Sequence, residues 1–284
     1  MTKLKKKSSK NRQFLRGGAV VCACAALLGA MALLLPDQAP SRPVEPSSVA
    51  QITEEPTSPI PSNPYGPEDF SYEGAYLACT AGPALPGIDV SSYQGQIDWQ
   101  AVADSGIRFA MIRLGYRGTT SGGLYPDERA LENLTGAAEA GLQVGAYFFS
   151  QATSVREAAL EAAYCIGVLE GRQLELPVVF DWEFTGSDTR TAQMEPQVLM
   201  DCIRIFCDSM EDAGYASMVY FNSHLEQTML ELEELLDYPF WLAMYSDEMT
   251  YPHAVQMWQY SANGNVPGIS GDTDLNLLFT DSTP

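Results

Sequence analysis

Lysine and histidine are scarce in this sequence, and their scarcity excludes several classes of function. No Lys follows Lys10, and the only two His are His224 and His253. Beyond residue 16, nine Arg stand against 36 Asp and Glu. A surface this acidic repels phosphate backbones, which argues against nucleic acid as a partner of the main body. Two His also disfavour a His-rich metal site and a Ser-His-Asp hydrolase.

Two further sequence signatures are missing. No Gly-x-Gly-x-x-Gly follows the first apolar run, where Gly87-Ile88-Asp89 stands instead, so a dinucleotide-binding domain is disfavoured. The cysteines outside the N-terminal apolar stretch are too few and too irregularly spaced for a zinc motif or a disulfide framework. We expect buried free thiols for at least two of them, and a single bridge stays open: Cys79, Cys165, Cys202 and Cys207.

The N-terminus combines a basic run with an apolar one. Residues 1–16 hold seven Lys and Arg and no acid, and residues 17–35 carry no charge. Nineteen residues at a rise of about 1.5 Å just cross a hydrocarbon core of about 30 Å. Because no small-residue cleavage site follows closely, we predict a cytoplasmic tail and a single-pass membrane anchor, with the remainder outside the cell. The alternative is a cleaved signal segment and a secreted protein.

A proline-rich segment follows the apolar stretch. Residues 36–67 contain nine Pro, separated mainly by small and polar residues. Such a composition is typical of an extended, semi-rigid spacer. We therefore assign residues 36–84 to a linker and extension, and residues 85–284 to the folded domain.

The folded domain alternates short apolar runs with amphipathic stretches. Helical spacing of apolar residues occurs at 127–140, 155–169 and 196–213. Strands that are apolar on both faces and alternate with helices are typical of a parallel sheet covered by helices. We predict an α/β fold, a compact barrel, with an open doubly wound sheet as the alternative. The expected strands are 87–91, 108–116, 143–150, 177–183, 217–222, 240–245, 255–260 and, more weakly, 273–277.

Acidic residues stand at the ends of several of these strands. Asp89 ends the first, and Asp181 and Glu183 end the fourth, on one face of the strand, with Trp182 pointing the other way. Asp274 lies on the last. Active sites of α/β barrels lie at the carboxyl ends of the strands, where these acids would converge. Burying carboxyls together raises their pKa values, which suits a proton donor beside an anion.

Two other interpretations of these acids stay open. In the first interpretation, these acids are helix caps or loop residues. In the second, three or four of them bind Mg²⁺ or Ca²⁺. Aromatic residues mark the same strand ends and are typical of a carbohydrate cleft, although rings also fill ordinary cores. The candidate sugar-binding residues are Tyr93, Tyr116, Tyr147, Tyr220, Trp241 and Tyr245.

Residues 86–279 resemble family 25 of the glycoside hydrolases, the lysozyme-type N-acetylmuramidases. The resemblance rests on the order and spacing of several segments together. They are Gly87-Ile88-Asp89-Val90-Ser91-Ser92-Tyr93-Gln94-Gly95, Ile97-Asp98-Trp99, Ala140–Tyr147, Phe180-Asp181-Trp182-Glu183, Val219-Tyr220, Phe240–Tyr245, Trp258-Gln259-Tyr260 and Asp274-Leu275-Asn276. One position departs from many members, which carry His where this chain has Phe148, and this puts the local polarity of the cleft in doubt.

The resemblance implies an irregular (β/α) barrel of the TIM type and no cofactor. It places the general acid on Glu183, its partner on Asp181, lining acids at Asp89 and Asp274, and a substrate contact at Gln259. The implied reaction is hydrolysis of the β-1,4 bond between N-acetylmuramic acid and N-acetylglucosamine in cell-wall peptidoglycan. The alternatives are a catalytically silent glycan-binding module and a hydrolase of another amino-sugar polymer. We expect a monomer whose partners are glycan strands and, through its N-terminus, the membrane.

Overall fold

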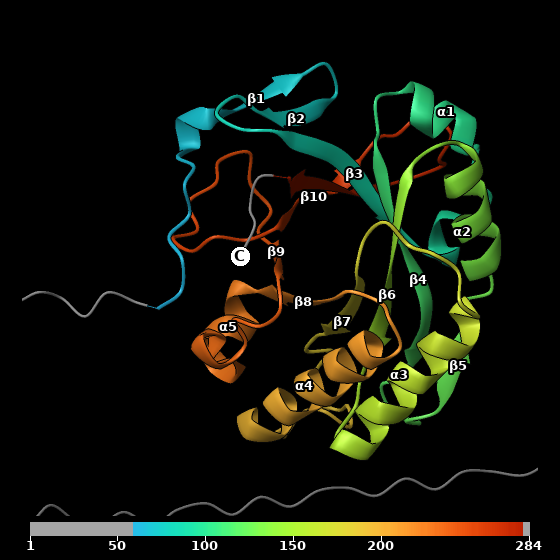
Figure 1. Ribbon diagram of the computed structural model, residues 1–284, viewed down its shortest axis with the longest axis vertical. Coiled ribbons are helices and arrows are strands. Elements are labelled where there is room, and N and C mark those ends of the chain that lie inside the picture. Colours follow the sequence, from blue (N-terminus) through green and yellow to red (C-terminus); the bar gives the residue numbers. More distant parts are fainter. Residues whose placement is uncertain (1–58, 281–284) are drawn as a thin grey trace, which may run out of the picture. The chain divides into compact units, whose positions relative to one another are not determined.

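Eight strands form a closed barrel, in which every strand pairs with two neighbours (Figure 1). Seven are mutually parallel, and β11 runs antiparallel between β10 and β3. Pairing of β3 with β4 closes the ring, so the barrel prediction is confirmed and the open doubly wound alternative is wrong. The barrel strands are β3 (Ala84–Val90), β4 (Phe109–Arg117), β6 (Gln143–Ser150), β7 (Val178–Trp182), β8 (Ser217–Asn222), β9 (Phe240–Ala243), β10 (Met257–Gly264) and β11 (Thr273–Phe279).

This computed structural model describes residues 59–280, which belong to one compact unit. The basic tail at 1–16, the apolar segment at 17–35 and the first part of the spacer lie outside the described residues. Between residues 59 and 280, no helix has the length and apolar character that crossing a membrane requires.

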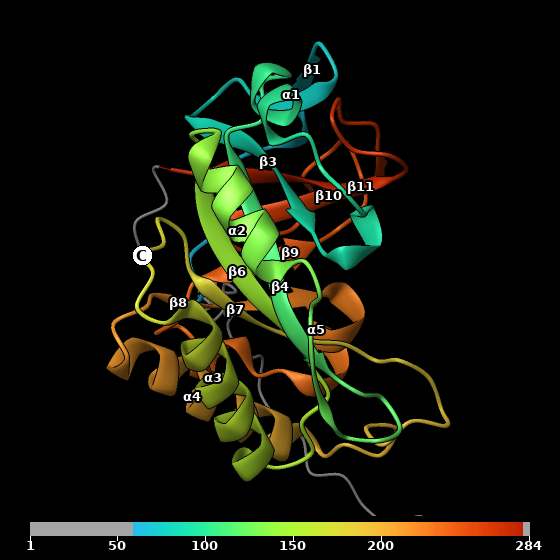
Figure 2. The ribbon, with the colours of Figure 1, turned by 90° about the vertical axis from the view of Figure 1, so that its right-hand side faces the viewer.

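Helices connect most of the parallel strands and cover the barrel. Figure 2 shows α2 along β4 and β6, and α3 beside α4. The expected helix at 155–169 is confirmed residue for residue, because Ser154 caps it by accepting from the Glu157 N–H and Glu170 ends it in the left-handed conformation. No described helix joins β9 to β10, which makes the barrel irregular. The α-helices are α1 (Trp99–Asp104), α2 (Ala130–Glu139), α3 (Val155–Leu169), α4 (Pro196–Asp212) and α5 (Ser223–Met229), and the 3₁₀ helices are η1 (Pro67–Asp69), η2 (Ser92–Gln94) and η3 (Leu232–Glu234).

Alternating side chains of each strand divide the core into two parts. Val179 of β7 packs inside the barrel, whereas Phe180 and Trp182 belong to the larger core between barrel and helices. The predicted outward direction of Trp182 is therefore confirmed. Phe148 is also fully buried on the outer side, where its ring contacts Tyr164 of α3 at 5.7 Å. The doubt about cleft polarity at Phe148 was thus misplaced, because this side chain does not face the cleft.

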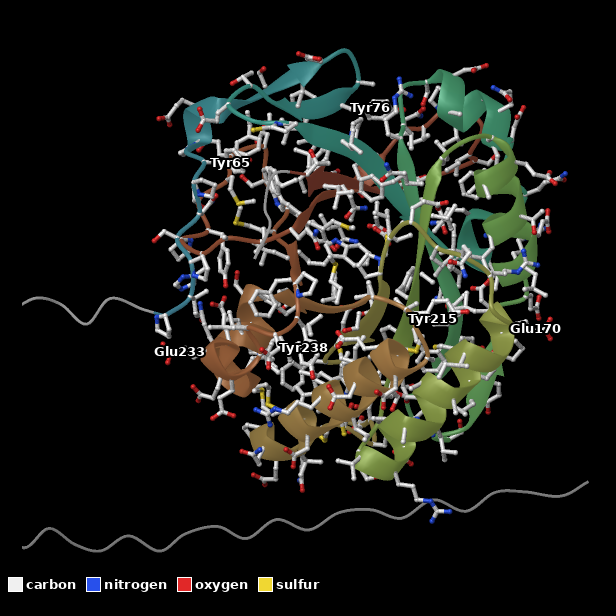
Figure 3. All side chains as sticks on the ribbon, viewed as in Figure 1. Tyr65, Tyr76, Glu170, Tyr215, Glu233 and Tyr238 are labelled. Carbon is white, nitrogen blue, oxygen red and sulfur yellow. The ribbon has the colours of Figure 1, made fainter. Side chains whose placement is uncertain are left out.

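Part of the predicted linker is folded onto the barrel. Ser62 forms a β-bridge with His253, and β1 (Phe70–Glu73) and β2 (Tyr76–Cys79) form a hairpin beside β3. The Phe70 ring packs on Trp258 at 5.2 Å. Tyr76, labelled in Figure 3, hydrogen bonds through its hydroxyl to Ser105 Oγ at 2.8 Å. The spacer prediction is therefore wrong for residues 59–67, since the few apolar residues among the prolines suffice to attach this segment.

The described cysteines carry free thiols. Cys165, Cys202 and Cys207 are buried in the helix layer, and Cys79 is partly exposed. The expectation of buried free thiols is confirmed.

Close packing inside the barrel predicts opposite effects for two glycine-to-alanine changes. A Cβ at Gly87 would lie about 2.2 Å from the Phe109 ring, whereas a Cβ at Gly167, on the exposed side of α3, meets nothing within 4 Å. We expect Gly87→Ala to lower the free energy of unfolding by about 1–3 kcal/mol. Gly167→Ala should raise it by about 0.5–1 kcal/mol. Urea unfolding measures both, and equal effects would contradict the packing inside the barrel.

Candidate active site

One mouth of the barrel collects the strand-end acids. The seven parallel strands present their carboxyl ends there, and β11, which is antiparallel, presents its beginning, so Asp274 lies opposite Asp89 in register. A cleft of about 220 Å³ opens at this mouth. Its lining residues are Asp89, Arg113, Tyr147, Phe149, Asp181, Glu183, Tyr220, Trp241, Tyr245, Gln259 and Asp274.

Most of the residues expected from the sequence therefore lie together. The four acids line the cleft, and so do Tyr147, Tyr220, Trp241, Tyr245 and Gln259. Two expected residues, Tyr93 and Tyr116, are not among the lining residues. Two lining residues, Arg113 and Phe149, were missed because both lie in apolar strands that periodicity interprets only as core.

A chain of hydrogen bonds among residues of the cleft holds Asp89 in place. Its Oδ2 accepts from Gln259 Nε2 and from Asn276 Nδ2, each at 2.8 Å. Gln259 Oε1 in turn accepts from the hydroxyls of Tyr220 at 3.1 Å and Tyr245 at 3.2 Å. The amide orientations of Gln259 and Asn276 are thereby fixed, and both present donors to one carboxyl oxygen.

Burial and the charges of neighbouring carboxyls raise the pKa values of Asp89 and Asp274. Burial raises the pKa of Asp89 to about 6, although the hydrogen bonds from Asn276 and Gln259 act in the opposite direction. The pKa of Asp274 is raised to about 7 by burial and by the charge of Asp89. The cleft therefore keeps protons that exposed carboxyls lose near pH 4.

Asp181 and Glu183 form a hydrogen-bonded carboxyl pair. Burial raises the pKa of Asp181 well above its ordinary value, and the charges of Glu183 and Asp89 raise it further. Burial also raises the pKa of Glu183, whereas its hydrogen bond with Asp181 lowers it. Both carboxyls therefore hold protons more strongly than exposed acids do, and the two titrate as a pair. Asp181 Oδ1 is buried and has no hydrogen-bond partner among residues 59–280.

Arg113 brings the positive charge that lines the cleft. Its guanidinium donates to Asp127 Oδ2 through Nη2 at 2.8 Å and through Nε at 2.9 Å, and the Asp127 carboxylate is buried outside the cleft. The same guanidinium lies over the rings of Tyr93 at 4.9 Å and Tyr116 at 5.4 Å. An Arg in the middle of the apolar run Phe109–Tyr116 was the signal that could have revealed this position.

Tyr93 and Tyr116 lie beside the cleft as a rim. Tyr93 is 84% exposed on η2, and Tyr116 stacks on Tyr125 at 5.3 Å. With Arg113 over the rings of both Tyr93 and Tyr116, these side chains form a partly exposed wall. Such a wall offers stacking surface next to the acids.

No arrangement of three or more His, Cys, Asp or Glu suited to a metal ion occurs between residues 59 and 280. Asp89 instead accepts from the side-chain amides of Gln259 and Asn276, and Asp181 and Glu183 pair with one another. This geometry gives the metal-binding interpretation no support.

Comparison with known proteins places this geometry among glycosidases. The family model described as glycosyl hydrolases family 25 matches residues 88–269. Lysozyme M1 of Streptomyces globisporus is 32% identical over 214 residues, covering 69% of this chain and 70% of its own. The autolytic lysozyme of Clostridium acetobutylicum is 30% identical over 193 residues, covering 68% of this chain and 55% of its own.

A solved structure of an autolysin also has a similar fold. The modular autolysin LytC from Streptococcus pneumoniae, in complex with a synthetic peptidoglycan ligand, superposes with a TM-score of 0.61 at 26% identity. The match covers 69% of this chain and 47% of LytC. This chain thus spans about half the length of LytC and of the clostridial lysozyme.

The raised pKa values predict an unusual pH dependence of stability. Protonated Asp89 and Asp274 persist in the folded state to about pH 6 and about pH 7, but ionise near pH 4 in the unfolded chain. The folded state then binds more protons in this window, so the free energy of unfolding should fall as pH rises from about 4 to about 7. Asp274→Asn should flatten this fall. Urea unfolding at several pH values tests it, and an unchanged slope in the variant would contradict the assignment.

Proposed function

Because the chain belongs to family 25 of the glycosyl hydrolases, we propose that it is a muramidase. It hydrolyses the β-1,4 bond between N-acetylmuramic acid and N-acetylglucosamine in peptidoglycan. The observation that carries this proposal is the buried Asp181–Glu183 pair at the mouth of the barrel, whose raised pKa values favour a proton shared within the pair. Glycosidic cleavage needs a protonated carboxyl at the leaving oxygen, beside negative charge that faces the oxocarbenium-like centre.

Glu183 is the general acid of this mechanism. Its pKa is raised by burial, which favours the protonated form that a general acid needs. It also stands less buried than Asp181, which places it nearer the substrate side of the pair. After cleavage, the same carboxylate accepts a proton from the incoming water.

Asp181 orients the 2-acetamido group of the sugar. Its unpartnered Oδ1 is an acceptor that an acetamido N–H satisfies, and this bond favours the charged form of Asp181. The shared proton then moves to Glu183, where the reaction needs it. This role of Asp181 is the one that internal attack by the acetamido oxygen requires.

Asp89 and Asp274 supply negative charge at the opposite side of the cleft. Their positions are fixed by strand register and, for Asp89, by Gln259 and Asn276. Preorganised charge of this kind stabilises the positive centre that develops at the sugar ring. Tyr93 and Tyr116 add stacking surface for neighbouring sugars along the rim.

The alternative of a catalytically silent glycan-binding module fits less well. A binding module has no use for a shared buried proton, and all four acids are present in the cleft. A hydrolase of another amino-sugar polymer, such as chitin, would use the same acetamido chemistry. Product analysis on peptidoglycan distinguishes it.

We also propose that the enzyme is tethered to the cell membrane with its barrel outside. Residues 17–35 would span the bilayer and residues 1–16 would stay in the cytoplasm. Since the folded unit already includes residues 59–67, the spacer is residues 36–58, which reach up to roughly 70 Å at about 3.1 Å per residue if fully polyproline-like. That reach carries the cleft from the bilayer into overlying wall.

Replacing the general acid tests the reaction. Glu183→Gln keeps the shape and removes the transferable proton, so lysis of purified cell wall should fall by roughly 10²-fold or more. Glu139→Gln, on the exposed face of α2, is the matched control and should lyse wall like the wild type. Borohydride reduction of the wild-type products should convert muramic acid; conversion of glucosamine alone would indicate a different bond. Near wild-type lysis by the Glu183→Gln variant would mean that another group donates the proton.

Cell fractionation tests the tether. The full-length protein should sediment with membranes, resist washing with high salt, and keep its original N-terminus. External protease should release the barrel from intact cells after removal of the wall. Recovery mainly in the medium, with a mature N-terminus near Gln51, would instead establish a secreted enzyme.

A further inference from the structure

Glu183 stands at the first position after its strand. The ladder contacts of β7 end with Trp182 against Ser150 on one side and Asp181 against Tyr220 on the other. Residues 183–195 then form a loop without helix or strand, up to the start of α4. The sheet therefore fixes Asp181 directly, whereas the backbone of Glu183 needs another support.

Gln151 provides that support from the neighbouring strand end. It follows β6 directly and is fully buried. Its Nε2 donates to the backbone oxygen of Glu183 at 2.9 Å and to that of Ser150 at 2.9 Å. Its Oε1 accepts from the hydroxyls of Thr185 and Thr191, each at 2.9 Å. All four hydrogen-bonding positions of the amide are thus occupied, and three of them hold the loop that begins at Glu183.

Two ion pairs, one buried and one partly exposed, keep Gln151 itself in place. Its backbone oxygen accepts from Arg190 Nη1 at 2.9 Å, and Arg190 pairs with Glu157 of α3 at 2.7 Å. The preceding Ser150 donates to Glu161 Oε2 at 2.7 Å, and Glu161 is paired with Arg117. The Ser150–Glu161 contact therefore anchors the end of β6 to α3 independently of the loop, whereas Arg190 links Gln151 to α3 from within the loop.

We infer that Gln151 is a positioning residue of the active site: its amide holds the Glu183 backbone so that the Glu183 carboxyl meets Asp181 and the leaving oxygen. This inference rests on the proposed function of Glu183. Gln151 does not line the cleft, and it would act on the reaction through the Glu183 carbonyl. A displacement of about 1 Å at a reacting group lowers the rate by up to roughly 10²-fold. Loss of the hydrogen bond from Gln151 to Glu183 should therefore lower kcat measurably.

A purely structural role makes different predictions. An ordinary loop anchor lowers stability, and activity then follows the folded fraction with an unchanged pH profile. A positioning residue changes the contact between Glu183 and Asp181. Its replacement therefore lowers kcat with KM nearly constant. It also shifts the limb of the pH–rate profile that reports the proton of the Asp181–Glu183 pair.

The test compares Gln151→Met with Thr191→Val in the full-length protein. Gln151→Met keeps the length of the side chain and removes the donor to Glu183, whereas Thr191→Val removes one loop bond and leaves that donor intact. Kinetics on a soluble glycan of alternating N-acetylglucosamine and N-acetylmuramic acid should show kcat at least about tenfold lower for Gln151→Met, with KM within about twofold. Thr191→Val should keep both the kcat and the pH profile, even where its Tm is lower.

A second variant and a second measurement keep the outcome decisive. Gln151→Glu keeps the size and both threonine contacts, and as a carboxylate it loses the donors to the backbone oxygens of Glu183 and Ser150, so its kcat should fall likewise. Titration of the Glu183 carboxyl by ¹³C NMR should show a shifted apparent pKa in the variants at position 151 and not in Thr191→Val. Wild-type kcat in folded variants at position 151, or equal losses in all three variants, would overturn the inference. Absence of cleavage by the wild type would overturn the proposed function instead, and the NMR titration would still decide the role of Gln151.

Discussion

The cost of burying four carboxyls at one end of the barrel governs the rest of this site. Each acid loses water, and each feels the charges of the others, so their pKa values rise together. The protein offsets part of this cost with neutral amides, Gln259 and Asn276, which donate to Asp89 without supplying a full positive charge. Neutral donors hold the carboxyl in place and still leave protons in the cleft, which a buried Lys or Arg in direct contact would remove.

The sequence was sufficient to predict the elements that depend on periodicity. All eight barrel strands were expected, and the helix at 155–169 was expected to the residue, because buried strands and an amphipathic helix with a Ser cap leave strong local patterns. The convergence of the acids followed from one rule, that strand ends of a barrel meet at one mouth. Asp274, near the beginning of its strand, reaches the same mouth only because β11 is antiparallel. The pattern of apolar residues does not reveal this strand direction.

What could not be predicted depends on contacts between distant residues. The packing of the hairpin at 70–79 on Trp258 and the attachment of Ser62 to His253 involve partners almost 200 residues away, of which the local sequence gives no sign. Gln151 is a similar case, since a Gln after a strand is ordinary in sequence. Its importance appears only when the Glu183 carbonyl and the two threonine hydroxyls are seen to converge on one buried amide.

The ion pair between Arg113 and Asp127 limits the effect of a positive charge on the acids of the cleft. A free guanidinium lining the cleft would stabilise the charged forms of the nearby acids and lower their pKa values. Here the charge of Arg113 is largely compensated by Asp127 at 2.8 Å, and it is the weakest of the influences that set the pKa of Asp181. Arg113 can therefore order the aromatic rim through Tyr93 and Tyr116 while the carboxyl pair keeps its proton. The pairing outside the cleft is what makes a cation compatible with an acid catalyst inside it.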